Sequence, residues 1–467
     1  MLALARDPKY SDVANVRLGP FGDYVFLLSP GSVRNVTVDQ AEAAFPRRFS
    51  VDLFETLGLN RGIVYAQGSL HKEQKKRCVP SFENVNSMRS FLSAIQEESV
   101  ITSQAWRSRC DAVGGSTRLD VYDEARRLTL AVVLRVTFGV GDFAKAEELS
   151  FVIGEYLTKI VATANELPPL WRINPALSSN YSAVAGENGL LARLRSLVLA
   201  IIAERRAAGA EKTGAADLLG VLIDSDASDD AILYTLFDLI IAGSDTTAST
   251  VTALLFLLHR PGAEEYLAEA LQEASSIPRN ADGTLQVSLD DCAPGGSLAF
   301  LTRCARETLR LYPPVPFIGR DSVAEAEVLG YGVPEGSTLC WSPWFLGRDH
   351  RQWLEPVDSF RPERWITAGE LAAAEEGSQL AQVSAWGRTP SGEPRDTFAW
   401  LPFGAGPRGC LGTRLGITET VVAAAVLLRD FDFEFDRKGD PLRVKYDLTL
   451  NLEGACRANV TRRADEL

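Results

Sequence analysis

The chain has 467 residues, of which 46% are hydrophobic and 23% charged, as is ordinary for a globular protein with a large core. Its net charge of −13 argues against general nucleic-acid binding, which requires a basic surface. The seven cysteines are irregularly spaced and do not resemble a disulfide framework, which favours reduced thiols facing the cytosol. No apolar run is expected to reach the roughly 18–20 residues of a bilayer span.

The N-terminal sixty or so residues are typical of short strands and turns. Asn15–Leu18 and Tyr24–Leu28, joined through Gly19–Gly22, predict a hairpin. From about residue 70 to residue 277, apolar residues recur at three- and four-residue spacing, which predicts helices. Pro168-Pro169 interrupts this helical part.

A long helix is predicted in the middle of the chain. Ser228 is a good helix cap, and acidic residues follow it in the first turn. The pattern continues without a breaker to Arg260, where Pro261 ends it. At about 1.5 Å per residue, such a helix is about 50 Å long and crosses a whole domain.

The remaining elements are shorter. We expect a helix at Leu298–Leu311, strands at Ala326–Leu329 and Ser337–Trp341, a surface insertion or mobile loop at Gly369–Pro394, a helix at Leu415–Leu428, and final strands within Phe431–Arg462.

The segment Phe403–Gly412 carries one cysteine, Cys410, in a glycine-rich turn beside Arg408. Glycines let the backbone curl closely enough to give N–H donors to a thiolate. A helix that starts at the cysteine should lower the thiol pKa with its positive end. The alternative is a buried structural cysteine in a glycine-rich turn.

This loop resembles the haem-ligand loop of the cytochrome P450 family, in which a cysteine binds the haem iron axially. The resemblance implies a mainly α fold with small β-sheets (α+β) and one domain over residues 1–467. Within it, residues 1–66 would be β-rich, and residues 67–467 would form the helical, haem-binding body. It also implies haem b as cofactor, Cys410 as the iron ligand, and Phe403 among the cofactor-binding residues.

Inside the long helix, Ala242, Gly243 and Thr246 fall on one face. Glycine within a helix costs about 1 kcal/mol relative to alanine, and the close approach of a flat ligand is one reason to accept that cost. The segment resembles the family's oxygen-activation segment. By that resemblance, Thr246 would hydrogen-bond dioxygen or its water, and Asp245 would help deliver protons. The alternative is a core helix with a thread of small polar residues.

Glu307 and Arg310 are three residues apart, a spacing that is common on any solvated helix. The later segment Phe360–Trp365 contains Arg364. Together the three charged residues resemble the family's Glu–Arg–Arg triad, whose role is structural support of the cysteine loop.

Haem carries two propionates, which arginine binds well. By the resemblance, Arg408 and Arg320 would contact them. The third site departs from the family, because His71 and Lys75 stand where many members have Trp-x-x-x-Arg. Both can still donate to a propionate, although His71 could instead be a surface residue.

Four basic residues form a patch on this acidic chain: Lys72, Lys75, Lys76 and Arg77. The resemblance places this patch where an acidic redox partner docks, and the alternative is a solvated helix face. Glu166–Trp171 could be a substrate-access or membrane-touching loop, or a plain turn between helices.

These residues together predict a haem-thiolate monooxygenase that takes electrons from a reductase or ferredoxin and inserts one oxygen atom of O2 into an apolar small molecule. The rivals are a haem-thiolate enzyme that rearranges lipid hydroperoxides without a reductase, and a haem sensor or carrier without turnover. By the resemblance, the chain starts near the family's first strand, and an anchor upstream of it, as in many eukaryotic members, could have been removed. We expect the native protein at a cytosol-facing membrane surface, in peripheral contact with it, or in a plastid.

Overall fold

The computed structural model describes residues 11–17, 23–49, 52–139, 143–164, 166, 168–207, 217–225, 227–367, 387–436, 444–446, 449–453 and 456–463. The predicted turn at 19–22 and most of the predicted insertion at 369–394 lie outside these residues.

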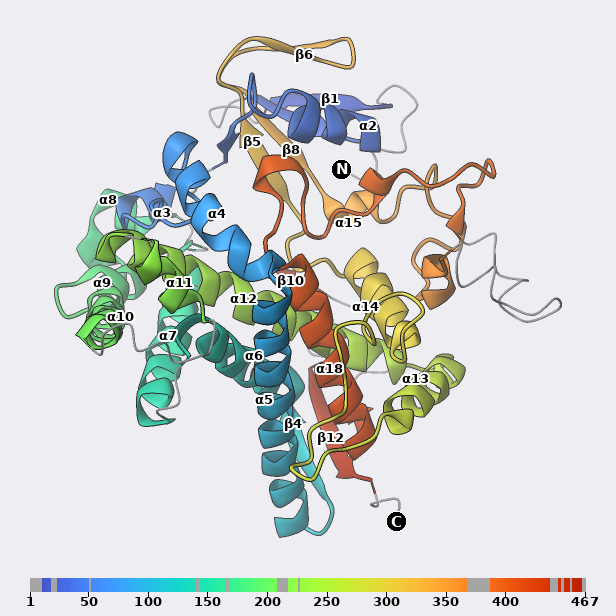
Figure 1. Ribbon diagram of the computed structural model, residues 1–467. Helices are drawn as coiled ribbons and strands as arrows, with labels where there is room; N and C mark the ends of the chain where they lie inside the picture. Colours follow the sequence, from blue (N-terminus) through green and yellow to red (C-terminus); the bar gives the residue numbers. More distant parts are fainter. Residues whose placement is uncertain are drawn as a thin grey trace.

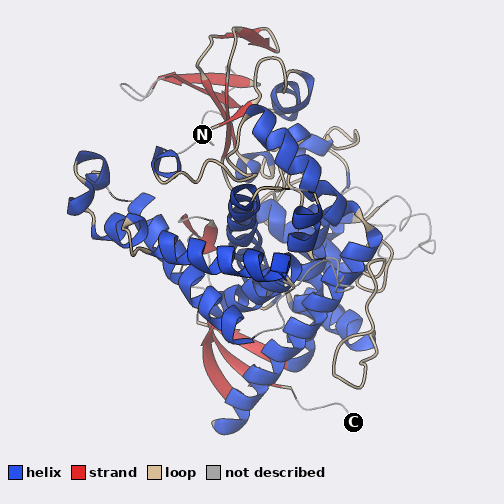
Figure 2. Ribbon diagram, turned by 60° about the vertical axis from the view of Figure 1, so that its left-hand side comes forward, coloured by secondary structure: helices blue, strands red, loops and turns tan. Residues whose placement is uncertain are grey.

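Most strands gather at two opposite ends of the molecule, and helices fill the space between them together with the small β10–β11 pair (Figures 1 and 2). One end carries a five-stranded sheet of order β1-β2-β8-β5-β3 and the β6–β7 pair; the other carries a three-stranded sheet of order β4-β12-β9. The strands are β1 Val13–Arg17, β2 Asp23–Leu27, β3 Arg47–Arg48, β4 Ser116–Asp120, β5 Ile318–Asp321, β6 Ala326–Val328, β7 Tyr331–Val333, β8 Thr338–Trp341, β9 Phe431–Phe435, β10 Val444–Tyr446, β11 Leu450–Leu452 and β12 Arg457–Arg462.

The helices form the body of the protein, which confirms the predicted mainly α fold with small sheets. They are α2 Pro30–Arg34, α3 Asp52–Thr56, α4 Gly68–Glu83, α5 Val85–Ala112, α6 Val121–Phe138, α7 Phe143–Ala164, α8 Leu170–Ile173, α9 Ser179–Ala185, α10 Leu190–Ala207, α11 Leu218–Asp224, α12 Asp229–Leu258, α13 Glu264–Ser276, α14 Ala299–Leu311, α15 Pro343–Leu346 and α18 Thr413–Asp430, with a π-helical turn, η2, at Asn35–Asp39.

Helix α12 is the predicted long helix, and its start is confirmed. The Ser228 hydroxyl accepts the N–H of Ala231 at 3.2 Å, and the helix ends at Leu258, two residues before the predicted Arg260. Its apolar composition and length would suffice for a membrane span, contrary to the expectation from sequence. However, 72% of that apolar window is buried inside the protein, so α12 is a core helix.

The largest apolar core surrounds α12 and includes side chains of α5, α6 and α18. A second, smaller core lies in the five-stranded sheet and contains Val25, Phe45 and Trp341. The predicted hairpin is confirmed, since β1 and β2 pair antiparallel with Val13 opposite Leu27. The cysteine loop lies between the two cores, because it leads from Leu401 of the smaller core into α18.

Candidate functional site

The cysteine loop owes its path to glycine. Gly404 and Gly406 both have φ of 66°, in the left-handed region. A Cβ at Gly406 would lie 1.8 Å from the carbonyl oxygen of Thr37, so only glycine lets the loop pass this close to η2. The N–H of Cys410 donates to the carbonyl of Phe403 at 2.9 Å and closes the turn just before α18. The Cys410 side chain is thereby exposed at the start of a helix that is otherwise largely buried.

The thiol pKa of Cys410 differs from the sequence-based expectation. Desolvation by the surrounding protein raises it, although the N–H of Gly412 and the charges of Arg48 and Lys75 act in the opposite direction. The N–H of Gly412 at the start of the helix thus lowers the thiol pKa as predicted, but desolvation outweighs it, so the net shift of the free thiol is upward. A bound metal ion deprotonates a coordinating thiol outright, so it would supply the missing stabilisation.

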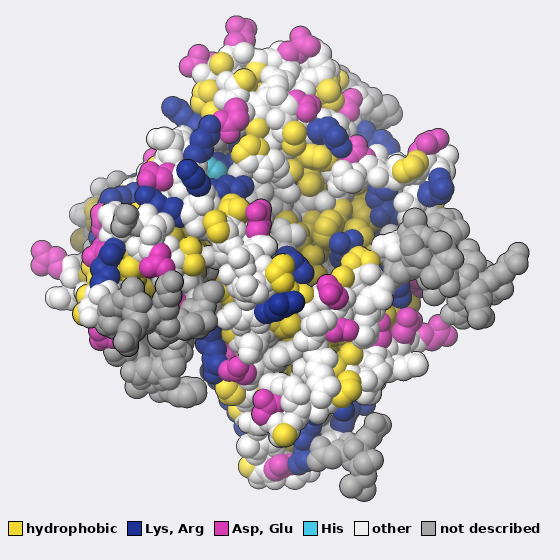
Figure 3. Space-filling view, in the orientation of Figure 1, with side chains coloured by type: hydrophobic (Ala, Val, Ile, Leu, Met, Phe, Trp, Pro, Cys, Tyr) yellow, Lys and Arg dark blue, Asp and Glu magenta, His cyan; other side chains and the backbone are white. Residues whose placement is uncertain are grey.

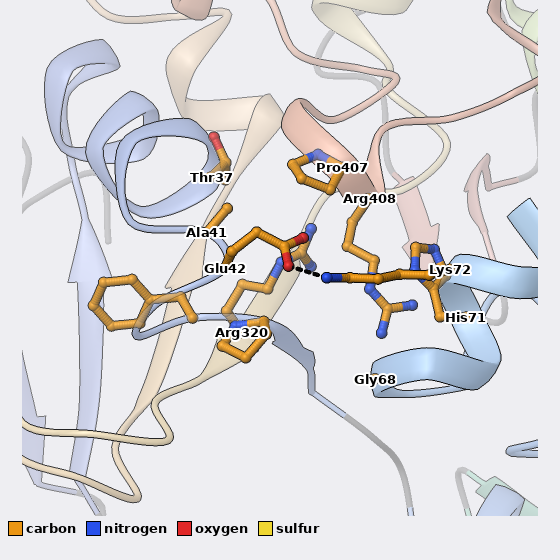
Figure 4. A pocket seen from close by; sticks show the side chains of 11 residues that line it. Thr37, Ala41, Glu42, Gly68, His71, Lys72, Arg320, Pro407 and Arg408 are labelled. Atoms are coloured by element: carbon orange, nitrogen blue, oxygen red, sulfur yellow. Dashed lines mark hydrogen bonds and ion pairs between the residues drawn. The ribbon is translucent and has the colours of Figure 1, made fainter. Parts of the chain in front are cut away.

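Five basic side chains meet beside this loop: Arg48, His71, Lys75, Arg320 and Arg408. Figure 4 shows Arg320, Arg408 and His71 around one pocket, together with the ion pair of Lys72 and Glu42. Burial and then the neighbouring arginines lower the pKa of Arg320 to about 9 and that of Arg408 to about 10. Like charges thus gather in a desolvated place, which is costly unless an anion joins them.

The same cluster leaves hydrogen-bond donors without acceptors. Among the described residues, no atom accepts from the buried Nε of Arg48 or from Nη1 of Arg408. The other terminal nitrogen of Arg408 donates to the carbonyl of Ala66 at 2.6 Å and to Oε1 of Gln67 at 2.7 Å, which fixes the guanidinium plane. Orphaned donors on fixed cations suit the two carboxylates of haem, so the residues present fit this cofactor.

Two further residues define the cluster. His71 is buried, which excludes the alternative of a surface residue, and burial followed by Arg408 and Lys75 lowers its pKa to about 3. It would therefore donate to a propionate as a neutral imidazole. Arg48 was not predicted from the sequence: strand pairing places it directly opposite Arg320, and only this long-range register brings it into the cluster.

The basic patch of α4 is partly neutralised within the protein. Lys72 pairs with Glu42, and Arg77 pairs with Glu73 at 2.5 Å. Lys75 donates to the carbonyl of Pro407, which joins α4 to the cysteine loop. Lys and Arg side chains nevertheless gather over the region of α4 in the space-filling view (Figure 3).

One face of α12 borders an open space. Ala242 is exposed and Thr246 is partly exposed, although most residues of the helix around them are buried. The Thr246 hydroxyl donates to the carbonyl of Ala242 at 2.6 Å. The next residue, Thr247, approaches the start of α18: its hydroxyl and the Phe403 ring would both lie 4.0 Å from a Cβ at Gly416. The open face of α12 and the cysteine loop therefore lie in the same region.

Asp245 and Gly243 contact other elements of the fold. The Asp245 carboxylate is buried and accepts hydrogen bonds from Tyr122 of α6 and from Thr449, just before β11. A Cβ at Gly243 would lie 2.8 Å from Cγ2 of Val133 in α6. The close neighbour that requires this glycine is thus a helix, and not the flat ligand expected from the sequence.

The structure brings Glu307, Arg310 and Arg364 together, with all three side chains fully buried. Arg310 donates to both Glu307 oxygens at 2.7 and 2.8 Å, and Nε of Arg364 lies 3.4 Å from Oε1. Burial alone would raise the pKa of Glu307, but Arg310 and then Arg364 hold it below its ordinary value. The arginines also donate to carbonyls of residues 347–359, which fixes the segment that leads to the cysteine loop.

Comparison with known proteins agrees with this geometry. A family model described as cytochrome P450 matches residues 5–453. Cytochrome P450 71D18 of Mentha gracilis is 27% identical over 97% of this chain and 85% of its own length. Cytochrome P450 71D13 of Mentha piperita is 26% identical over 93% and 81%. The crystal structure of the cytochrome P450DA heme domain shares the fold, with a TM-score of 0.72 at 20% identity over 99% of this chain and 91% of that one. The chain therefore belongs to the cytochrome P450 family.

Proposed function

We propose that this protein inserts one oxygen atom of O2 into an apolar small molecule that binds along the open face of α12, with electrons from a reductase or ferredoxin that docks over α4. Family membership supports the coarser statement, a haem-thiolate monooxygenase, and it implies a redox partner, O2 and a hydrophobic substrate. The observation that carries the proposal is the exposure of Ala242 and Thr246 within an otherwise buried helix, beside the loop of Cys410.

Cys410 would hold the haem iron, and the five basic residues beside its loop would hold the propionates. The bound haem supplies the activation of O2. Thr246 carries the hydroxyl that faces the open side of α12, so it is the group placed to hydrogen-bond O2 or water there. Because that hydroxyl already donates to Ala242, it must either turn to donate elsewhere or accept from a water.

The docking side of the proposal rests on charge. Lys72 and Lys76 of α4 are exposed on a protein whose net charge is −13, so an acidic partner would be steered to this region. Peripheral membrane contact is supported by the exposed apolar side chains of Ile173, at 70%, and Leu177, at 57%, in and after α8.

The test has two stages. First, the dithionite-reduced protein with carbon monoxide should show the strongly red-shifted Soret band of thiolate-ligated haem, and Cys410→Ala should lose it. Second, apolar substrates that shift the haem spin state should be oxidised only with an added electron donor, with reductase and ferredoxin compared as donors. Consumption of a lipid hydroperoxide without any donor would contradict the proposal, and so would failure of Thr246→Ala to divert electrons to hydrogen peroxide.

A further inference from the structure

The Asp245 carboxylate is held at both of its oxygens by hydroxyl groups from two other parts of the chain. Tyr122, at the start of α6, donates to Oδ1. Thr449, just before β11, donates to Oδ2 at 2.5 Å. Both contacts are long-range, and Asp245 and Thr449 are 6% and 2% exposed. The carboxylate therefore has one preferred orientation on α12.

A second set of contacts fixes the two donors themselves. The Asn451 amide lies 3.4 Å from the Tyr122 oxygen and 3.3 Å from the Thr449 hydroxyl, and donates toward both. One turn after Asp245, the Ser249 hydroxyl donates to Oδ1 of Asn451 and to the carbonyl of Leu450 at 3.1 Å. Helix α12 is thus joined to β11 at two successive turns, and the hydroxyls on Asp245 cannot move independently.

The chemistry of the donors suits a carboxylate that must stay in place while it exchanges protons. Burial, followed by the charge of Asp245, raises the pKa of Tyr122, so the phenol keeps its proton and remains a donor. Hydrogen bonds to a charged group are stronger than those between neutral groups. Asp245 precedes Thr246 on the helix, and a general acid contributes most when its orientation is fixed in advance.

We propose that Tyr122 and Thr449 are positioning residues that hold the Asp245 carboxylate, one residue before Thr246 on α12, in a fixed orientation for its role in proton delivery. The inference rests on the proposed function only in assigning proton delivery to Asp245. Nothing in the motif around Asp245 indicates either partner, because they lie 123 and 204 residues away in the sequence.

The experiment compares Tyr122→Phe and Thr449→Val, which remove one hydroxyl each and keep the shape, with Asp245→Asn as reference. Thr129→Val is the matched control, since Thr129 also joins α6 to α12, through the Ser244 carbonyl at 2.8 Å, without touching Asp245. Thr449→Ser keeps the donor and should behave as the unsubstituted protein. Each holoprotein is first checked for an unchanged carbon monoxide spectrum.

Two readouts separate positioning from simple stability. With substrate and electron donor, product formed per O2 consumed should fall roughly tenfold in Tyr122→Phe and Thr449→Val, and the solvent deuterium isotope effect on product formation should rise. Independently of turnover, the effects of the two substitutions on the urea midpoint should be non-additive. Tyr122→Phe should lower the midpoint clearly less when Asp245 is already Asn.

Three results would overturn the inference in distinguishable ways. If the two hydroxyl variants keep the product ratio and isotope effect of Thr129→Val while Asp245→Asn changes both, the hydroxyls do not position the carboxylate. If Asp245→Asn itself changes neither, the proton-delivery role of Asp245 falls as well. Additive urea midpoints would show that Tyr122 and Asp245 are not coupled in the folded protein.

Discussion

Gly243 of α12 lies directly against Val133 of α6, and a Cβ at position 243 would lie 2.8 Å from Cγ2 of that valine. Real Cβ atoms do not approach so closely, and Val133 is itself 5% exposed and packed in the core. The two helices can keep their separation only while residue 243 has no side chain. The position of the α12 segment that carries Thr246 therefore depends on this contact with α6.

We expect Gly243→Ala to destabilise the protein by about 1–3 kcal/mol, because overpacking outweighs the higher helix propensity of alanine. The measurement is the free energy of unfolding in urea. Gly154 of α7 is the matched control: it is also a helical glycine, and no neighbouring atom lies within 4 Å of the place that a Cβ would take there. Gly154→Ala should leave stability unchanged or raise it by up to about 1 kcal/mol, and equal effects at the two sites would contradict this account.

The charged triad gives a second prediction. Glu307→Gln removes the negative charge shared by two fully buried arginines, so it should cost about 3–5 kcal/mol of unfolding free energy and reduce haem content. The pair of Arg193 and Glu148, 2.8 Å apart and half exposed, is the control. Glu148→Gln should cost under about 1 kcal/mol. A small effect of Glu307→Gln would mean that the segment before the cysteine loop is held by its apolar contacts alone.

Local signals predicted the elements and the charged motifs well. Ser228 and Pro261 delimit the long helix, and the spacing of Glu307 and Arg310 puts both on one face of α14. What the sequence could not predict depends on pairing between distant segments. Arg48 enters the basic cluster only through the register of β3 with β5, and Tyr122 reaches Asp245 only through the packing of α6 on α12. The direction of the Cys410 pKa was missed for a similar reason, since desolvation depends on the whole surrounding fold.

A pH dependence is expected from Asp238 of α12. Its carboxylate is buried and accepts the N–H of Val64 at 2.6 Å. Burial raises its pKa to about 7 from an ordinary 3.8, although the N–H of Val64 and the charge of Arg48 oppose this shift. The folded state therefore binds a proton more tightly than the unfolded state. The corresponding stability is present below about pH 4 and is lost as the pH rises toward about 7.

Asp238→Asn should remove this dependence, since the amide oxygen can still accept from Val64 but does not titrate. Between pH 5 and pH 8, the unsubstituted protein should lose stability relative to Asp238→Asn, by roughly 1.4 kcal/mol for each unit of the pKa difference in that window. Unfolding free energies at several pH values provide the measurement. Asp230→Asn, on the same helix but in the exposed pair with Arg61, should leave the slope unchanged. Parallel curves for Asp238→Asn and the unsubstituted protein would show that Asp238 is ionised in the fold throughout.

The basic cluster should oppose folding of the haem-free protein and favour retention of haem. In Arg320→Met one of the mutually repelling cations is removed, together with its guanidinium contact over the Trp341 ring, and an unbranched apolar side chain takes its place. We expect the haem-free variant to be as stable as the unsubstituted protein or more so, because Arg320 is desolvated beside Arg48 and Arg408. Haem should nevertheless leave the holo-variant roughly tenfold faster, since a charge-assisted hydrogen bond to a carboxylate is lost.

Urea midpoints of the haem-free proteins and haem transfer to a scavenging protein measure the two effects separately. Arg193→Met makes the same change of net charge outside the cluster and should alter neither. A variant whose stability and haem retention fall together would instead show that Arg320 supports the fold and has no special relation to an anionic ligand.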